Sequence, residues 1–368
     1  MKYPFGIISD THNHNFSSFA TILPNGLNSR LDYTLAEIQR AGEEVLKQGG
    51  DTLFHTGDLF HVRGNVCPSV QNPTKALFEE LTEKGLNIIL LAGNHDLESE
   101  SASDLHNAST ILDSINGVEV VSSRWVYRSV CKVAMLPWFE SLDELRTNVA
   151  ELIAEISARG DLSSYELMLH APLNGVIPGM PDIGLTPEEV MEWGFKRVFF
   201  GHYHNHKSFE DKVFSVGATT HQTWGDIGSL AGFLIVGEDK VTHHKTLAPN
   251  FVAITGEDFE DMDAMLLMEK VVDNFVRLDL GLVSVETIEK CKKYLMDMGA
   301  RGVIVRATKK SEASRVDSLG TGATAGSVDS LEDATCKWID SNLDGEEDPD
   351  VIGQAKLIAM NALSTVEE

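Results

Sequence analysis

Five short groups of residues in this chain carry side chains of the types that commonly bind divalent metal ions. Each group follows an apolar run. The groups are "SDTHNH", "TGDLFH", "AGNHD", "LHAP" and "GHYHN". Together they offer the oxygen and imidazole groups of Asp10, His12, Asp58, Asn94, His95, His170, His202 and His204. Carboxylate, carboxamide and imidazole groups without a thiolate suit Mn²⁺ or a similar ion better than a structural Zn²⁺.

One such group alone has a simpler interpretation. In "LLAGNHDLESE", Gly93, Asn94 and Asp96 are all residues that favour turns, and Leu97 resumes an apolar pattern. That stretch by itself is typical of a turn. Five such endings, each within a residue or two of an apolar run, instead favour one shared site.

The elements that must position these groups alternate along the chain. Strands are predicted at "FGIIS", "TLFHTG", "NIILLAG", "CKVAMLPW", "YELMLH" and "RVFFG". Helices are predicted over 30–47 and 142–159. Another is predicted with Asn72 as its cap, Pro73 at its first position and Gly85 past its end, and a short one begins after a Thr186 cap. "KVFSVG" and "GFLIVGEDKVTHHKTL" are typical of β-hairpins. This alternation predicts a layered α/β fold with its site at the strand ends.

The pattern changes after about residue 250. "NFVRLDLGL", a helix from about Ser284 to Gly299, and "RGVIVRAT" predict a small strand–helix–strand unit. A following stretch rich in Ser, Gly and Thr is typical of a flexible linker, and the acidic end of the chain carries apolar residues at helical spacing. The predicted segments are 1–250, 251–308, 309–328 and 329–368.

Composition narrows the class of protein. The chain has 368 residues, of which 42% are hydrophobic, enough to bury a core. It shows no signal-peptide pattern and no run of about 18 apolar residues, so we expect a soluble protein that is not secreted and has no membrane partner. Its four cysteines are far apart and form no CxxC pair, which argues against a zinc ribbon or a disulfide framework.

The ordered set D-x-H, GD, GNHD, H and GHxH resembles the motifs of the calcineurin-like metallophosphoesterases. The "GDLFH" form of the second motif is most similar to the SbcD and Mre-eleven DNA-repair nucleases, a group that includes the recombination nuclease subunit of T-even phages. The resemblance covers roughly residues 1–250. It implies a layered β-sandwich flanked by helices, a small α/β capping domain at 251–308 that faces DNA, and a C-terminal helical tail at 329–368.

The resemblance also implies how the candidate ligands divide. Asp58 would bridge two Mn²⁺ ions, with Mg²⁺ or another divalent ion as alternatives. Asp10, His12 and His204 would complete one metal shell, and Asn94, His170 and His202 the other. Two ions about 3.5–4 Å apart can bind the phosphate, generate hydroxide and stabilise the leaving oxygen of a phosphodiester.

Three further residues receive roles by the same resemblance. His95 would touch the substrate phosphate or protonate the leaving 3′ oxygen, and Asp96 would orient that imidazole. His61, in "GDLFH", would lie near the metal site behind the ligands or facing DNA. This family usually has Leu-Gly where this chain has Asn13-His14, so His14 inherits no role. The histidines at 14, 55, 106, 206, 221, 243 and 244 are interpreted as structural or exposed.

The implied activity is that of a metal-dependent DNA exonuclease, 3′–5′ on duplex DNA, and endonuclease. Such a nuclease is a subunit of an SbcCD-like repair and recombination complex. Its partners would be DNA, an SbcC-type coiled-coil ATPase bound by the tail, and a second copy of the chain. The expected location is the cytoplasm of a bacterium or a phage-infected host cell.

The net charge of −26 argues against a phosphate-rich partner, but two bound divalent ions reverse the charge at the scissile phosphate. Two other functions remain open. One is a phosphatase or phosphodiesterase for small molecules, which the sequence beyond residue 250 disfavours. The other is a non-catalytic scaffold on the same fold, which usually loses ligands, whereas no ligand is missing here.

Overall fold

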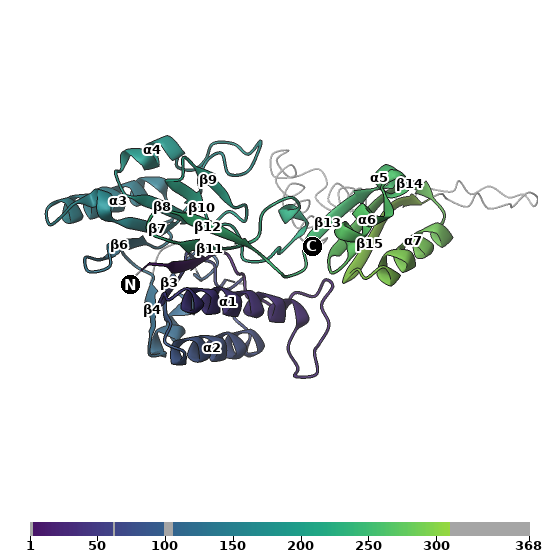
Figure 1. The fold of residues 1–368 in the computed structure, drawn as a ribbon, viewed down its shortest axis with the longest axis horizontal. Helices are drawn as coiled ribbons and strands as arrows, with labels where there is room; N and C mark the ends of the chain where they lie inside the picture. The colour runs from purple at the N-terminus through teal and green to yellow at the C-terminus, as the bar shows by residue number, and fades with distance from the viewer. Residues whose placement is uncertain (1–2, 62, 99–105, 310–368) are drawn as a thin grey trace, which may run out of the picture. The chain divides into compact units, whose positions relative to one another are not determined.

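The computed structural model describes residues 3–61, 63–98 and 106–309 (Figure 1). The chain divides into two units, Met1–Lys309 and Lys310–Glu368. The tail predicted at 329–368 lies outside the described residues, as does the predicted linker after Lys309. None of the helices in the described ranges has both the length and the apolar character needed to cross a membrane.

Two six-stranded sheets form the larger part of the first unit. The first has the order β12-β11-β1-β2-β3-β4. Its strands are β1 Phe5–Ile8, β2 Thr52–His55, β3 Asn87–Leu91, β4 Val118–Val121, β11 Gly232–Val236 and β12 Val241–Lys245. Strands β1 to β4 run parallel, and the β11–β12 hairpin adds on antiparallel.

The second sheet has the order β5-β6-β7-β8-β10-β9. Its strands are β5 Val126–Arg128, β6 Val133–Leu136, β7 Glu166–His170, β8 Arg197–Gly201, β9 Lys207–Phe209 and β10 Val213–Ser215. The four inner strands are parallel, and the short edge strands β5 and β9 are antiparallel. Both predicted hairpins are therefore present.

The two sheets pack face to face, with helices on both outer faces (Figure 1). Phe5 and Phe54 from the first sheet bury their rings in one cluster with Met168 and Phe199 from the second. Helices α1 Ser29–Lys47 and α2 Pro68–Glu83 cover the outer face of the first sheet, and α3 Leu142–Ser157 and α4 Pro187–Glu192 cover that of the second. The predicted β-sandwich flanked by helices is confirmed.

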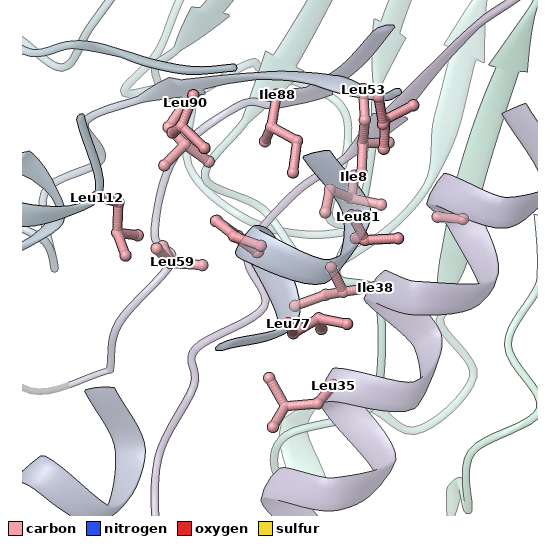
Figure 2. Close-up of a cluster of buried hydrophobic side chains, with 14 of the residues drawn as sticks. Ile8, Leu35, Ile38, Leu53, Leu59, Leu77, Leu81, Ile88, Leu90 and Leu112 are labelled. Atoms are coloured by element: carbon pink, nitrogen blue, oxygen red, sulfur yellow. The ribbon is translucent and has the colours of Figure 1, made fainter. Parts of the chain in front are cut away.

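Figure 2 shows how α1 and α2 are held on the first sheet. Strand residues such as Ile88 and Leu90 meet Ile38 of α1 and Leu81 of α2, and all four are fully buried. Burying one such side chain stabilises the folded state by about 1.5–3 kcal/mol relative to leaving it exposed. The strands that end at the candidate ligands are therefore fixed by close packing against the helices.

The predicted start of α2 was wrong. The helix begins at Pro68, with Cys67 as its cap residue, and Pro73 lies inside it rather than at its first position. Proline is favoured at the first helical position because its missing N–H has no partner there in any case. Both prolines carry this signature in the sequence, and the earlier one starts the helix.

A separate parallel sheet of three strands follows, in the order β13-β14-β15. Its elements are β13 Phe251–Thr255, α5 Gly256–Asp261, α6 Ala264–Val271, β14 Phe275–Val283, α7 Val285–Asp297 and β15 Gly302–Lys309. The predicted strand–helix–strand unit corresponds to β14, α7 and β15, and Ser284 caps α7 as expected. The strand β13 and helices α5 and α6 were not predicted. Leu267 of α6 and Leu295 of α7 pack in one cluster with strand residues such as Ile254 and Leu278.

Candidate metal centre

The candidate ligands lie at the C-terminal ends of five strands. Asp10, Asp58 and Asn94 follow β1, β2 and β3 of the first sheet, whereas His170 ends β7 and His202 follows β8 of the second. Parallel strands bring such ends to one side of a sheet. The site lies at the strand ends, as predicted from the sequence, and it is assembled from both sheets.

Backbone strain gathers at these residues. Asp10, His12 and Asp58 have φ values of 46°, 45° and 59°, and His202 has a φ of 109°. Positive φ is uncommon for residues other than glycine, and such residues cluster at functional sites, where the surrounding structure holds them. The four conformations turn the chain sharply as it leaves each strand.

Two glycines let the loops approach each other. Gly57 has a φ of 105°, which a side chain would disfavour. At Gly93 the constraint is space, because an added Cβ would lie 2.1 Å from Oδ1 of Asp58 and 2.3 Å from its backbone nitrogen. The glycine before Asn94 is therefore required for the position of Asp58.

Replacing Gly93 with Ala is expected to displace Asp58 and to weaken divalent-metal binding, which isothermal titration calorimetry with Mn²⁺ would measure. Gly281→Ala is the matched control, because a Cβ there meets no atom within 4 Å. Equal Mn²⁺ binding by the two variants would contradict the assigned contact.

The ligand atoms of Asp10, His12 and His204 form one cluster, all within 4.8 Å of one another. Nε2 of His204 lies 3.1 Å from Nε2 of His12. The carboxylate of Asp10 is fixed by the hydroxyl of Ser9 and by the backbone N–H of His202, which donates to it at 3.0 Å. This cluster contains the residues expected around the first ion.

Asp58, His170 and His202 form a second cluster of the same size. Oδ1 of Asn94 lies 3.1 Å from Nε2 of His170 and 3.2 Å from Nδ1 of His202. Asp58 also faces the first cluster, because its Oδ2 lies 3.7 Å from Nε2 of His12 and 3.6 Å from Nε2 of His170. One carboxylate thus lies between two groups of candidate ligands.

Hydrogen bonds fix the protons of two of the imidazoles. Nδ1 of His170 lies 2.7 Å from the carbonyl oxygen of Thr56, and Nδ1 of His204 lies 2.7 Å from Oδ1 of Asp226. Since these oxygens accept hydrogen bonds, each Nδ1 is the donor and Nε2 of each ring faces its cluster. This second contact is the usual one for a histidine that binds a metal ion.

Burial sets the charge of the site. It raises the pKa of Asp10 and of Asp58 to about 6, and it lowers the pKa of His12 and holds that of His202 at about 3. Burial also disfavours charge on His204, but the hydrogen bond and negative charge of Asp226 outweigh it and raise the pKa of His204 to about 9. The buried carboxylates of Asp10 and Asp58 beside the neutral imidazoles of His12 and His202 fit a divalent cation, which would supply positive charge there.

His95 and His61 lie beside the first cluster. The backbone N–H of His95 donates to Oδ1 of Asp58 at 2.8 Å, and its ring centroid is 4.8 Å from that of His12. The ring of His61 stacks on that of His95 at 5.7 Å, and its Nδ1 is 3.4 Å from Nδ1 of His12. His14, which was given no role, contacts His61 at 5.1 Å between ring centroids.

The expected role of Asp96 is not the one that the structure gives it. Nδ1 of His95 lies 2.7 Å from the carbonyl oxygen of His61, which orients the ring in place of Asp96. The buried Asp96 carboxylate accepts four backbone N–H groups, from Asp58, Leu59, Phe60 and Gly93, at 3.0–3.3 Å. Asp96 therefore holds the loop that carries Asp58.

Two residues at the site were missed by sequence reasoning. Asp226 contacts His204 from a short 3₁₀ helix, Trp224–Asp226, and Trp138 stacks on His202 with ring centroids 5.3 Å apart. Neither residue directly follows a predicted metal motif. The spacing Thr223-x-x-Asp226, which forms a capping box, was the available signal for Asp226.

Comparison with known proteins gives three similarities. A family described as calcineurin-like phosphoesterase matches residues 3–206, a range that includes every candidate ligand. The chain is 23% identical over 261 residues to Exonuclease subunit 1 of Enterobacteria phage T4, covering 67% of this chain and 74% of that protein. A dimetal phosphatase from Danio rerio is 12% identical, with a TM-score of 0.40, over 64% of this chain and 92% of that chain.

Proposed function

Because the chain belongs to the calcineurin-like phosphoesterase family, we propose that it is a two-metal phosphodiesterase that cleaves DNA. The observation that carries the proposal is the position of Asp58, whose Oδ2 lies within 3.7 Å of an imidazole nitrogen in each ligand cluster. The family and the similarity to a phage exonuclease subunit support a phosphoesterase or nuclease. More specifically, we propose that the chain is a 3′–5′ exonuclease on duplex DNA and also an endonuclease.

Two Mn²⁺ ions would occupy the site. One ion would be held by Asp10, His12 and His204, and the other by Asn94, His170 and His202. Asp58 would contribute to both sites. When bound, such ions neutralise the phosphate and lower the pKa of water, so that hydroxide is available at neutral pH. The mixed oxygen and imidazole donors suit Mn²⁺, and Mg²⁺ is the alternative.

The chain's own groups would handle the proton of the leaving oxygen. Since Nδ1–H of His95 donates to the carbonyl oxygen of His61, the proton available for transfer is the one that Nε2 carries when the ring is protonated. The backbone bond from His95 to Asp58 fixes the distance of the ring from the ligands. His95 would donate this proton to the leaving 3′ oxygen, and His61, stacked on it, would keep the ring in place.

The proposed organisation follows the same family. Residues 1–250 are the nuclease domain, 251–308 a capping domain that faces DNA, 309–328 a linker and 329–368 a helical tail. The tail would bind an SbcC-type coiled-coil ATPase within a repair and recombination complex, and two nuclease chains would associate. Such a complex acts in the cytoplasm of a bacterium or phage-infected cell.

A cleavage assay tests the proposal. Purified protein is treated with EDTA and supplied with Mn²⁺ or Mg²⁺, and duplex, hairpin and single-stranded DNA are compared with a small aryl phosphodiester. We expect DNA cleavage that requires the added ion. Rapid cleavage of the aryl ester without cleavage of any DNA would instead indicate a small-molecule phosphodiesterase.

Deleting residues 329–368 is expected to leave Mn²⁺-dependent cleavage by the isolated chain nearly intact and to abolish co-purification with the ATPase. The reason lies in the sequence alone, where Val351, Ala355, Ile358 and Ala362 form an apolar stripe at helical spacing. Ile358→Asp should reproduce the loss, and Glu367→Ala, outside the stripe, should not. A truncated chain that binds the ATPase with full affinity would contradict the assignment.

A further inference from the structure

A short segment, His221–Asp226, contacts both the three-stranded sheet and the candidate metal centre. At the sheet, Nδ1 of His221 accepts the backbone N–H of Phe251, the first residue of β13, at 3.1 Å. The ring of Trp224 meets that of Phe251 edge to face, with centroids 4.8 Å apart. The guanidinium carbon of Arg277, in β14, lies 5.3 Å from the ring centroid of Trp224.

The same segment contacts the metal centre at two points. Oδ1 of Asp226 accepts the hydrogen bond from Nδ1 of His204 at 2.7 Å. Nε2 of Gln222 donates to the carbonyl oxygen of Thr11 at 3.1 Å, and Thr11 lies between the candidate ligands Asp10 and His12. Both contacts are made to the cluster that contains His204.

Internal hydrogen bonds make the segment rigid. Oδ2 of Asp226 accepts the backbone N–H groups of Gln222 and Thr223 at 2.7 and 2.8 Å, and Oγ1 of Thr223 accepts that of Gly225 at 3.1 Å. Trp224 and Asp226 therefore belong to one closed turn. A shift of the Trp224 backbone would therefore move the Asp226 carboxylate or break these bonds.

Aromatic and cationic side chains hold Trp224 from the other side. Phe19 stacks on Phe275 of β14 at 5.2 Å and 14°, and it meets Trp224 at 5.9 Å. Arg30, buried at the start of α1, donates to the carbonyl oxygen of Gln222 and lies 5.2 Å from the ring of Phe251. The surroundings of the His221–Asp226 segment thus include the three-stranded sheet, the loop that carries Phe19 and the start of α1.

We propose that Trp224 is a positioning residue for the metal centre. The contact of Phe251 in β13 with Trp224 fixes the position of Asp226. The hydrogen bond of Asp226 in turn orients the ring of His204, so that Nε2 faces the Asp10–His12–His204 cluster, where the ion would bind. The proposal rests on the proposed function, because it presupposes a divalent ion there. It makes the affinity for that ion depend on the placement of the three-stranded sheet.

Mn²⁺ titration of the full chain without DNA tests the coupling, with electron paramagnetic resonance or calorimetry resolving the sites. Loss of an outer partner of a metal-binding histidine weakens metal affinity about 10–100-fold. Asp226→Asn should therefore weaken one of two Mn²⁺ sites by this amount. Trp224→Ala should weaken the same site by less than Asp226→Asn does, since the bonds within the turn remain. The double variant should match Asp226→Asn, because both changes act through one path.

Conservative variants separate positioning from general damage. Trp224→Phe keeps an aromatic edge against Phe251 and should restore most of the affinity, whereas Phe251→Leu should weaken the same site from the other side of the contact. Tyr294→Ala, at an exposed position of α7, is the control and should change neither site. Thermal unfolding identifies variants that do not fold. If Trp224→Ala does not fold, the Mn²⁺ affinity of Phe251→Leu decides whether the contact positions the metal centre.

The outcomes are distinct. Unchanged Mn²⁺ affinity in folded Trp224→Ala and Phe251→Leu, or equal weakening of both sites, would overturn the role of Trp224. A wild-type chain that binds no Mn²⁺ would overturn the proposed function itself. DNA cleavage does not enter the measurement, so failure of the nuclease assignment alone would leave this test interpretable.

Discussion

Replacing Asp58 with Asn is expected to abolish DNA cleavage and to weaken both Mn²⁺ sites. The side chain lies between the two clusters, and its Oδ2 is 3.7 Å from His12 and 3.6 Å from His170. An amide removes one negative charge and one of the two ligand oxygens. The loss of affinity should exceed the roughly 10–100-fold that removal of an outer partner costs.

Calorimetric Mn²⁺ titration and a DNA cleavage assay measure the two effects. The fold should survive, because Oδ1 of Asn can still accept the backbone N–H of residue 95, as Asp58 does at 2.8 Å. Asp239→Asn, in the exposed turn between β11 and β12, is the matched control. Two normally bound ions and a wild-type rate in the Asp58 variant would show that the site is wrongly assigned.

Replacing His95 with Asn should retain both Mn²⁺ sites and lower the turnover number by about 10²–10⁴, the usual contribution of a general acid. The ring is held by the carbonyl of His61 with its Nε2 free, and it lies against His12 without belonging to either cluster assigned to the ions. Single-turnover cleavage at saturating Mn²⁺ isolates the chemical step.

His244→Asn, on β12, is the control for this variant. The ligand atoms of His12, His61 and His95 also lie within 4.8 Å of one another, so a ligand role for His95 has a definite signature. Loss of an Mn²⁺ ion in the His95 variant would make this residue a ligand and overturn the division between binding and proton transfer.

The strands and the candidate ligands at their ends could be predicted because both are local in sequence. Each candidate ligand lies within three residues of the end of its strand, except His12, which lies four residues after β1. The resemblance supplied the number of layers. Strands β4 and β5 were missed because Glu119 interrupts the apolar run of β4 and β5 has only three residues.

Contacts between distant loops could not be predicted. The role of Asp96 depends on four backbone N–H groups, three of which lie 36–38 residues earlier in the chain. Asp226 meets His204 across 22 residues, through a turn that no periodic pattern marks. Such partners are set by how the loops pack after the strands have formed, so residue type and local spacing do not reveal them.

The assembly of the site from both sheets has a thermodynamic consequence. Asp10, Asp58 and Asn94 follow strands of one sheet, and His170 and His202 lie at strand ends of the other. A bound ion would therefore add a further link between two halves of the domain that hydrophobic packing and a few hydrogen bonds already join. A ligand that binds only the native state stabilises it by about 2.7 kcal/mol at 100 times its dissociation constant. Mn²⁺ concentration should therefore set the melting temperature of the whole sandwich, and metal loss in a cell would expose the protein to unfolding and proteolysis as well as inactivation.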